Sequence, residues 1–339
     1  MEKIVKKASR ILIIDLLYLG DLIFTTPFLR NLRKNCPQVR LEMIVNADFY
    51  DIMKNNSYLD RVNSFNKRWS VLKSWQFARK LKRNNYDLGI NLHGNWRSAL
   101  LLKLINPQYA TGFGGRGRGI FLDRKLKAKS GRHQVEVYLQ VLEDLGLTVF
   151  DKRLEIDVSS AAITVVNNFL EKEGVTAKQK VIVINPGGSW PAKRWSVQNF
   201  AILADLINEE FNCQVIFTGS SGDLKRVNSI RSLMKTEAII ATGKTSLEEL
   251  AALARSADLF ISGDTGPVHV AAAVRTPTVT IFGPSNPQKY RPYGDPQKHK
   301  IVTAELECRP CNQQQCPQNH THCMSLVTPQ IVLKTIRKI

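Results

Sequence analysis

A short stretch between Asp258 and Ser285 carries small polar residues at the spacing of a phosphate-binding turn. An apolar strand leads into the turn at Ser262 to Gly266, and a helix and a second apolar strand follow it. Pro267 suits the first helical position, because its fixed φ fits there and its missing N–H would have no intrahelical partner. Free N–H groups and the positive end of the helix dipole therefore meet at Asp264 to Gly266, where they favour a phosphate group. The alternative interpretation is an ordinary strand-to-helix turn.

Turns of similar composition follow other predicted strands. They are Gly20–Asp21 and His93–Gly94 in the first half, and Pro186–Lys193, Gly219–Asp223, Gly243–Thr245 and Asp264–His269 in the second. Ligands of parallel sheets bind at the carboxyl ends of strands, so these turns are the candidate site. The sequence has no GxGxxG after the first strand, no Walker pattern and no GxSxG elbow. A dinucleotide oxidoreductase, a P-loop ATPase and an α/β-hydrolase are therefore disfavoured.

Strands and helices must alternate to place these turns at sheet edges. In the first half we expect strands at 11–14, 41–45 and 88–92, and helices at 25–35 and 135–145. In the second half we expect strands at 181–185, 214–218, 238–241 and 259–261, with a last strand that ends at 282. The helices expected there are 197–211, 224–234, 247–256 and 268–274. This alternation predicts an α/β protein with parallel sheets in two Rossmann-like domains.

We place the domain boundaries from the same pattern. The first domain is expected at residues 1–155 and the second at 181–325. Residues 156–180 form a linking region that contains a helix at about 161–174, and residues 326–339 form a terminal helix. The apolar run near the amino terminus is interrupted by Asp15 and Asp21, so it predicts a first strand of a cytoplasmic protein and not a signal peptide. No run is long enough to span a membrane.

The net charge of +19 is placed unevenly. Residues 1–155 carry 28 basic and 14 acidic side chains, or +14, whereas residues 156–339 carry 20 and 15, or +5. Two segments concentrate this charge: Arg61–Arg83 has eight basic residues and no acidic one, and Arg116–Arg132 has seven against Asp123. The first half is therefore expected to meet an anionic partner, which can be nucleic acid, an acidic membrane surface or an acidic substrate.

The first basic segment also contains large apolar side chains at helical spacing, namely Trp69, Leu72, Trp75 and Phe77. A solvated basic helix packed through its aromatic residues and a functional surface are both open interpretations. A basic amphipathic helix can also lie at a membrane interface.

Four cysteines are closely spaced near the carboxyl terminus. They are Cys308, Cys311, Cys316 and Cys323, with His320 and His322 nearby. Their density is compatible with a zinc site, but the spacing lacks the usual pair of CxxC knuckles. A reduced or adventitiously oxidised loop is the interpretation we favour, because a cytoplasmic location makes disulfides unfavourable.

Three motifs in order resemble glycosyltransferase family 9, the ADP-heptose:lipopolysaccharide heptosyltransferases. They are Leu19–Asp21 followed by Thr25–Pro27, then Pro186–Trp195, then Asp264–Ala273. The resemblance covers nearly the whole chain. It implies a GT-B architecture, in which two Rossmann-like domains with parallel sheets face a central cleft and the terminal helix packs back on the first domain. It also implies an inverting transfer of heptose from ADP-heptose that needs no metal and no cofactor.

The resemblance also assigns roles to single residues. Asp21 matches the catalytic base, and Lys193 matches the lysine that neutralises the departing diphosphate. Donor-binding positions are Gly188, Ser189, Lys193, Ser221, Asp223, Thr245, Asp264, Thr265, Gly266 and His269, with the ribose contact open between Ser221, Gly222 and Asp223. Acceptor-binding positions are His93, Arg97, Arg116 and Arg118.

The partners implied by the resemblance are a nucleotide-sugar donor and an anionic, lipid-linked saccharide acceptor of the lipopolysaccharide inner core. The protein is expected at the cytoplasmic face of the inner membrane, as a peripheral protein with no nucleic-acid partner. Two alternatives remain at this stage. One is transfer of another nucleotide-activated sugar in surface polysaccharide assembly. The other is a basic nucleic-acid-binding protein, which would leave the strand-end turns unexplained.

Overall fold

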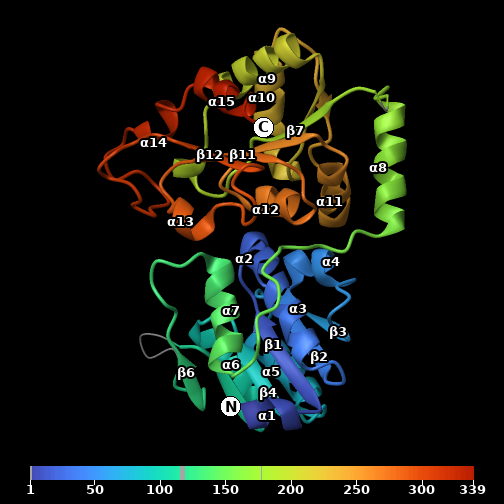
Figure 1. Ribbon diagram of the computed structural model, residues 1–339, viewed down its shortest axis with the longest axis vertical. Coiled ribbons are helices and arrows are strands. Elements are labelled where there is room, and N and C mark those ends of the chain that lie inside the picture. Colours follow the sequence, from blue (N-terminus) through green and yellow to red (C-terminus); the bar gives the residue numbers. More distant parts are fainter. Residues whose placement is uncertain (1, 115–118, 177) are drawn as a thin grey trace. The chain divides into compact units, whose positions relative to one another are not determined.

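The computed structural model of the protein describes residues 2–114, 119–176 and 178–339 (Figure 1). The chain divides into two compact units, residues 1–157 and 158–339, and each contains one six-stranded sheet. Within the described residues, the strands of both sheets pair in parallel. The predicted α/β class with two Rossmann-like units is confirmed. The predicted boundary at residue 155 lies beside the observed division.

The sheet of the first unit has the strand order β3-β2-β1-β4-β5-β6. Its strands are β1 (Arg10–Asp15), β2 (Arg40–Asn46), β3 (Arg61–Phe65), β4 (Leu88–Asn91), β5 (Tyr109–Phe113) and β6 (Arg124–Leu126). Its helices are α1 (Glu2–Lys7), α2 (Leu19–Phe24), α3 (Thr26–Asn35), α4 (Tyr50–Met53), α5 (Val71–Lys82), α6 (Trp96–Ile105) and α7 (Gln134–Asp144), with a 3₁₀ turn at Ala47–Phe49. The order reverses between β1 and β4, so a ligand crevice is expected at their carboxyl ends.

β1 is apolar along its length because helices cover both faces of the sheet. Ile11 to Ile14 are fully buried, and Leu12 and Ile14 pack in one cluster with Ala78 and Leu81 of α5. α5 packs beside α6, while α3 packs beside α7 (Figure 1). A strand buried on both faces has no reason to alternate polar and apolar residues, which is why its sequence is a continuous apolar run.

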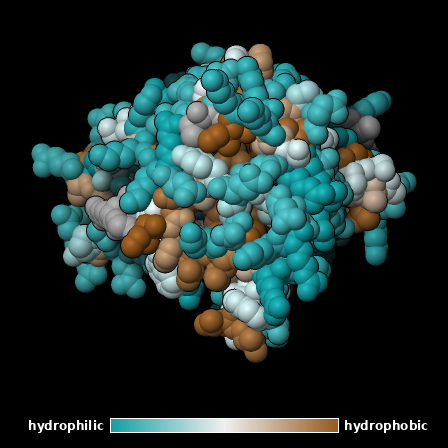
Figure 2. All heavy atoms as spheres, turned by 90° about the horizontal axis from the view of Figure 1, so that it is seen from below, coloured by the Kyte–Doolittle hydropathy of each residue, from teal (hydrophilic) through white to brown (hydrophobic). Residues whose placement is uncertain are grey.

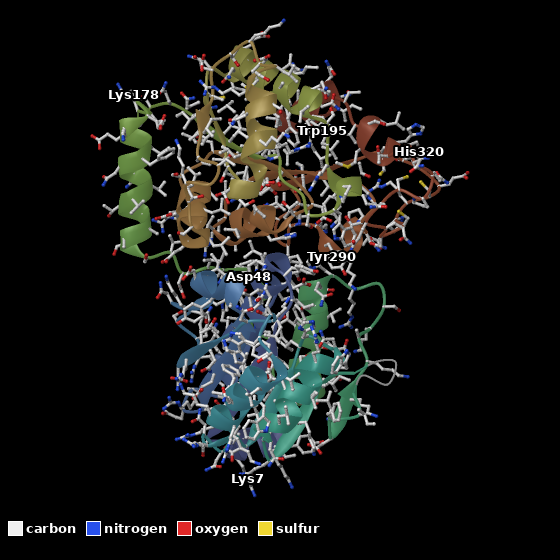
Figure 3. All side chains as sticks on the ribbon, turned by 180° about the vertical axis from the view of Figure 1, so that it is seen from behind. Lys7, Asp48, Lys178, Trp195, Tyr290 and His320 are labelled. Carbon is white, nitrogen blue, oxygen red and sulfur yellow. The ribbon has the colours of Figure 1, made fainter. Side chains whose placement is uncertain are left out.

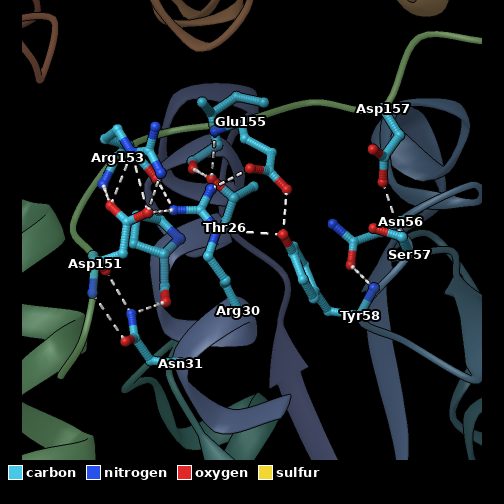
Figure 4. Close-up of polar contacts among 12 residues, drawn as sticks. Thr26, Arg30, Asn31, Asn56, Ser57, Tyr58, Asp151, Arg153, Glu155 and Asp157 are labelled. Carbon is cyan, nitrogen blue, oxygen red and sulfur yellow. Dashed lines mark hydrogen bonds and ion pairs between the residues drawn. The ribbon is translucent and has the colours of Figure 1, made fainter. Parts of the chain in front are cut away.

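A polar network on α3 holds the chain that leaves the first unit (Figure 4). The buried Arg30 guanidinium pairs with Asp151 at 3.1 Å and with Glu155, and it donates to the Arg153 carbonyl at 2.9 Å. Asn31 donates to the Asp151 carbonyl and accepts from the Phe150 N–H at 2.6 Å. Residues 150–155 are therefore fixed to the first unit by side chains of α3, and Asp157 is held separately because it accepts from the Ser57 N–H at 2.8 Å.

The sheet of the second unit has the order β12-β11-β10-β7-β8-β9, which is the same winding as in the first unit. Its strands are β7 (Val181–Asn185), β8 (Gln214–Phe217), β9 (Ile239–Ile240), β10 (Leu259–Gly263), β11 (Thr278–Phe282) and β12 (His299–Thr303). Its helices are α8 (Ser160–Lys172), α9 (Val197–Phe211), α10 (Leu224–Arg231), α11 (Leu247–Arg255), α12 (Gly266–Ala273), α13 (Pro287–Tyr290), α14 (His322–Ser325) and α15 (Pro329–Ile336), with 3₁₀ turns at Pro191–Lys193 and Ser221–Asp223. The order reverses between β7 and β10, which places the predicted phosphate turn at the switch point.

Two segments differ from the expected organisation. Much of the predicted linking region is α8, whose residues Ala162 and Val166 pack in the core of the second unit and whose neighbour is α11. The terminal helix α15 was expected to pack on the first domain, and this expectation is wrong. Its buried face, including Val332 and Ile336, joins the core of the second unit against α9, β11 and β12. Burial of its own apolar face on the nearest sheet decides its position.

Several elements were missed or misplaced. Gly20 and Asp21 were expected in a turn, but both lie in α2. Strands β3, β5, β6 and β12 and helices α1 and α6 were not predicted. By contrast, the predicted strand 181–185 and the helix 197–211 have the observed bounds.

The surface seen from below is mostly hydrophilic, with apolar side chains in separate patches (Figure 2). Among the described helices, none has both the length and the apolar character needed to cross a membrane.

The Arg30 network leads to a stability prediction. Arg30→Ala removes a buried cation that two carboxylates and a carbonyl contact, so the free energy of unfolding should fall by about 3 kcal/mol. Urea denaturation monitored by circular dichroism measures this change. The matched control is Arg153→Ala, because Arg153 pairs with the same Asp151 from an exposed position and its loss should leave stability nearly unchanged. Equal losses in the two variants would contradict the role of the buried network.

Candidate active site in two halves

The first half of the candidate site lies at the carboxyl edge of β1 and β4. Asp21 lies half-buried in the first turn of α2, three residues after the exposed Tyr18 that precedes the helix. Lys67, in the loop between β3 and α5, interacts electrostatically with Asp21 and Asp15, and also with Asp48 (labelled in Figure 3). Its ammonium lies 5.4 Å from the centroid of the Tyr18 ring. The predicted base, Asp21, therefore belongs to a cluster of three carboxylates around Lys67.

Asp15 ends β1 and is buried. One carboxyl oxygen accepts from the Leu17 N–H at 2.9 Å, while the other is buried without a hydrogen-bond partner among the described residues. Burial raises the pKa of Asp15 to about 7, and the negative charge of Asp21 adds to this rise. The Asp15 carboxyl is therefore partly protonated at neutral pH. In the sequence, Asp15 stands out only because it interrupts an apolar run, which does not reveal its place beside the predicted base.

His93 follows β4 and is held in one tautomer by its neighbour. The Asn95 side-chain oxygen caps α6 by accepting from the Ser98 N–H at 2.9 Å, so the amide NH₂ of Asn95 faces His93 Nε2 at 2.7 Å. Nε2 must then accept, and the proton of a neutral ring lies on Nδ1. Burial and the charge of Lys67 lower the pKa of His93 to about 4, which agrees with a neutral ring.

Polar side chains at this edge have capacity for further hydrogen bonds. Both amide atoms of the buried Asn91 and Nδ1 of His93 lack partners among the described residues. Buried polar groups of this kind are normally satisfied by water or by a ligand. Arg97, predicted to bind the acceptor, lies exposed in the first turn of α6, with its guanidinium 5.8 Å from the centroid of Trp96. Arg116 and Arg118 lie outside the described residues.

The second half of the site is built around Asp264, which follows β10 and is buried. Lys193, at the end of the β7–α9 loop, places its ammonium 2.6 Å from a carboxylate oxygen of Asp264. The Ser285 hydroxyl, after β11, donates to the same oxygen. The Lys193 ammonium also lies 4.4 Å from the centroid of the Trp190 ring. Three loops from neighbouring strands therefore converge on one carboxylate, as the strand-end argument predicted for Lys193 and Asp264.

α12 begins directly after this carboxylate. Gly266 is its first residue and Pro267 its second, so the start of the helix agrees closely with the sequence prediction. The Thr265 hydroxyl bonds to the Ser262 hydroxyl at 3.0 Å and makes no capping bond to the helix. Pro267 has no N–H and the Val268 N–H donates to the Thr265 carbonyl at 3.3 Å. The Gly266 N–H, at the first position of the helix, has no intrahelical acceptor and can bind an anion. His269 lies one turn into α12 and is buried.

The loop that carries Lys193 is fixed by residues that sequence analysis did not single out. Arg226 of α10 donates to the Pro186 carbonyl at 3.0 Å and to the Trp195 carbonyl. Arg194 donates to the carbonyl of Gly188 at 2.8 Å. The buried Trp195 ring (labelled in Figure 3) donates to the Val327 carbonyl at 2.7 Å. Loop geometry is thus set by long-range side-chain bonds for which the local sequence gives no pattern. Ser189 remains exposed.

The predicted nucleoside turns lie close together. Asp223 accepts from the N–H and hydroxyl of Ser220 at 2.9 and 2.6 Å, so its carboxylate stabilises the 3₁₀ turn Ser221–Asp223. A Cβ on Gly243 would lie 3.1 Å from the Ser221 Cα, which shows how closely the two turns approach. Thr245 is half-buried just before the amino-terminal capping box of α11. Ser221 and Thr245 thus lie on turns that pack together, while the Asp223 carboxylate is already engaged within its own turn.

The four closely spaced cysteines line one cavity of about 40 Å³ together with Arg309. Within residues 2–114, 119–176 and 178–339, no three His, Cys, Asp or Glu side chains are placed to hold a metal ion, so the zinc alternative gains no support. Backbone N–H groups of residues 318–321 lower the pKa of Cys316, whereas burial raises the pKa of Cys323. All four are free thiols in the structure.

Comparison with known proteins gives consistent matches. The model of glycosyltransferase family 9 (heptosyltransferase) matches residues 74–322. The lipopolysaccharide heptosyltransferase 3 of Escherichia coli (strain K12) is 32% identical over 291 residues, covering 81% of this chain and 83% of that protein. A glycosyl transferase family 9 structure from Veillonella parvula DSM 2008 has a TM-score of 0.88 and 29% identity, covering 97% of this chain and 96% of the other.

A second solved structure shows the same fold at lower identity. It is the ADP-heptose lipopolysaccharide heptosyltransferase II of E. coli, with a TM-score of 0.80, 22% identity and 97% coverage of both chains. This likeness confirms the predicted GT-B fold class.

The burial of Asp15 leads to a prediction about pH. Its pKa is raised on folding, so its contribution to stability is fully present below about pH 4 and is lost as the pH rises through about 7. Asp15→Asn keeps an acceptor for the Leu17 N–H and removes the ionisation. The variant should be more stable than wild type at pH 8 by on the order of 2 kcal/mol, with little difference at pH 4.

Thermal and urea unfolding at the two pH values measure this difference. Asp51→Asn, which changes an exposed carboxylate of α4, is the control and should show no such gain at pH 8. A gain of the same size for Asp15→Asn at both pH values would mean that ionisation of Asp15 is not the cause.

Proposed function

This chain belongs to glycosyltransferase family 9, and from that premise we propose that it transfers heptose from ADP-heptose to the inner core of lipopolysaccharide, with inversion at the anomeric carbon. The observation that carries the proposal is the ion pair between Lys193 and Asp264 beside the first turn of α12. It places a fixed cation and the positive end of the α12 dipole at the carboxyl edge of the sheet, where a nucleotide diphosphate would bind.

The donor half supplies the charge that the leaving group needs. As the bond between the anomeric carbon and the diphosphate oxygen breaks, negative charge grows on the departing ADP. The Lys193 ammonium and the amino end of α12 face this charge, and their positions are already fixed by Asp264, Trp190 and the loop contacts of Arg226. In this proposal the carboxylate of Asp264, which lies beside the same cation, accepts a hydrogen bond from a sugar hydroxyl.

The acceptor half supplies the base. In the proposed step, an acceptor hydroxyl attacks the anomeric carbon from the face opposite the diphosphate, and its proton passes to the carboxylate of Asp21. One displacement of this kind inverts the configuration at the anomeric carbon. Lys67 stands beside Asp21, and the neutral His93 and the amide of Asn91 offer hydrogen bonds to hydroxyl groups of the acceptor.

The acceptor class follows from the relatives and from charge. A relative that shares 32% identity is named a lipopolysaccharide heptosyltransferase, and the donor is the one named for the E. coli heptosyltransferase II of the same fold. The net charge of +14 in residues 1–155 suits a phosphorylated, lipid-linked saccharide. In this proposal the protein works as a peripheral protein at the cytoplasmic face of the inner membrane. The positive charge that neutralises the departing diphosphate comes from side chains of the protein.

The proposed base gives the first test. Asp21→Asn removes the proton acceptor but keeps the shape of the side chain, so kcat should fall by about 10²- to 10⁴-fold while the dissociation constant of ADP stays within about 2-fold. Release of ADP from ADP-heptose in the presence of a defined core acceptor measures kcat, and calorimetry measures ADP binding. Asp48→Asn is the control, since Asp48 faces the same Lys67. Wild-type turnover by Asp21→Asn would remove Asp21 as the base.

The proposed cation gives the second test. Lys193→Ala should weaken ADP binding by about 10- to 100-fold, the size expected for one charged hydrogen bond, and should also lower kcat. Lys225→Ala, which removes an exposed lysine of the same unit, should change neither value. Unchanged ADP affinity in Lys193→Ala would place the diphosphate elsewhere. A panel of nucleotide sugars completes the test, because transfer from another sugar in preference to ADP-heptose would overturn the proposed donor.

A further inference from the structure

We infer that the exposed faces of α5 and α6 form a docking surface for an anionic phospholipid bilayer, and that this surface holds the acceptor edge of the first unit at the membrane. The inference rests on the proposed function for the lipid-linked nature of the acceptor. It goes further by naming the surface that meets the lipid.

α5 turns only a narrow face toward the core. Ala78 and Leu81 are its buried side chains. Outside this buried face, Val71 at the start of the helix is 87% exposed, Leu72 is 62% exposed and Trp75 is 43% exposed. Large apolar residues at adjacent positions of a surface helix are not explained by packing within the protein, so they indicate a partner.

The exposed apolar residues of α5 lie beside basic ones. Val71, Trp75 and Arg79 follow one another at intervals of four and therefore share one side of the helix. The Arg79 guanidinium lies 5.2 Å from the centroid of the Trp75 ring. An aromatic ring with a guanidinium at its face suits the boundary between lipid tails and headgroups, because the ring prefers the interface and the cation meets phosphate.

α6 continues this surface, because it packs directly beside α5. Trp96 is 54% exposed in its first turn and Leu104 is 38% exposed near its end. The two helices together contain six basic residues and no acidic one: Lys73, Arg79, Lys80, Lys82, Arg97 and Lys103. The combined surface therefore has aromatic and aliphatic side chains set among positive charge only.

The position of this surface in the fold links it to the site. α5 follows the carboxyl end of β3, and α6 follows the carboxyl end of β4. In parallel strands these ends share one edge, so Val71, Leu72 and Trp96 in the first turns lie at the edge that carries Asp21 and His93. A bilayer at this surface would present a lipid-linked acceptor to the base with its lipid still embedded.

The character of the surface favours a bilayer over other partners. A second copy of the chain would bring two positive faces together, which opposes association. Single-stranded nucleic acid is bound by stacking on aromatic rings, and this gives no role to Val71 or Leu72. An amphipathic helix with apolar residues and lysines or arginines at its exposed face is the arrangement that binds an anionic lipid surface.

The test uses the full-length protein and vesicle flotation. Wild type should float with phosphatidylglycerol–phosphatidylcholine vesicles and bind pure phosphatidylcholine vesicles much more weakly, and binding should weaken as salt is raised. Two triple variants separate the contributions: Val71→Ser/Leu72→Ser/Trp75→Ser for the apolar part and Arg79→Gln/Lys80→Gln/Lys82→Gln for the charge. The charge variant should lose about 100-fold in affinity for the anionic vesicles, and the apolar variant at least 10-fold.

Matched controls lie on the second unit. Ile202→Ser/Leu233→Ser/Ile331→Ser changes comparably exposed apolar residues, and Lys225→Gln/Lys235→Gln/Lys334→Gln removes the same charge. Both should bind vesicles like wild type. Melting temperatures of all four variants should stay near that of wild type, because only exposed side chains change.

Activity separates this inference from the proposed function. Both α5 variants should keep wild-type kcat/KM on a deacylated, water-soluble core acceptor and lose activity on the same acceptor embedded in vesicles. If wild type binds anionic vesicles through α5 but transfers no heptose, the proposed function fails and the docking surface stands. If wild type ignores anionic vesicles, or the α5 variants bind them unchanged, the inference is wrong. Loss of a dimer or of oligonucleotide binding in these variants, with vesicle binding intact, would also overturn it.

Discussion

Parallel strand pairing is the constraint on which the site depends. When strands run in one direction, every loop that leaves a carboxyl end must lie at the same edge, whatever its distance along the chain. This is how Lys193, after β7, comes to lie 2.6 Å from Asp264, after β10, with Ser285 of the next strand on the same carboxylate. In the first unit the same rule gathers Asp15, Asp21 and His93. The same strand order repeats in both sheets, so each unit places its turns by the same means.

The buried carboxylates at the two sheet edges differ in how their charge is balanced. In the second unit the buried carboxylate of Asp264 has a cation and a hydroxyl as partners, so the pair is nearly neutral and its geometry is fixed. In the first unit the buried Asp15 has only one backbone N–H as a hydrogen-bond partner among the described residues and stands beside a second carboxylate. An unbalanced carboxyl group binds a proton more readily. The first arrangement suits binding of a charged ligand, whereas the second suits uptake of a proton.

Sequence patterns predicted the class of the fold and the location of the site. Strand 181–185 and the helix 197–211 were predicted with their observed bounds, because the strand is a pure apolar run and Ser196 caps a strongly periodic helix. β3 was missed because Arg61–Phe65 is mostly polar and lies near the sheet edge. The terminal helix was assigned to the wrong unit, since an apolar face shows that a helix is covered without showing what covers it.

Long-range contacts account for what the sequence did not reveal at the site. Asp264 and Lys193 were predicted as site residues, but Ser285, Trp190 and the clamp by Arg226 depend on which loops meet in three dimensions. Burial of Asp15 is equally invisible locally, because a carboxylate at the end of a strand is usually solvated. Spacing along the chain therefore identifies the turn that binds, whereas the residues that hold that turn in place emerge only from the packed structure.

The helices on the two faces of the first sheet have different tasks. Those on one face bind the segment that leaves the unit, and those on the other face present the proposed docking surface. α3 buries Arg30 and Asn31 against residues 150–155, so the protein itself covers that face. α5 buries only Ala78 and Leu81, and α5 and α6 leave Trp75 and Trp96 partly exposed. Ile11 to Ile14 of β1 are fully buried while Val71, Leu72 and Trp75 stay exposed, so the core does not require these residues of α5. Their positions are free to serve a partner, and their single sign of charge selects an anionic one.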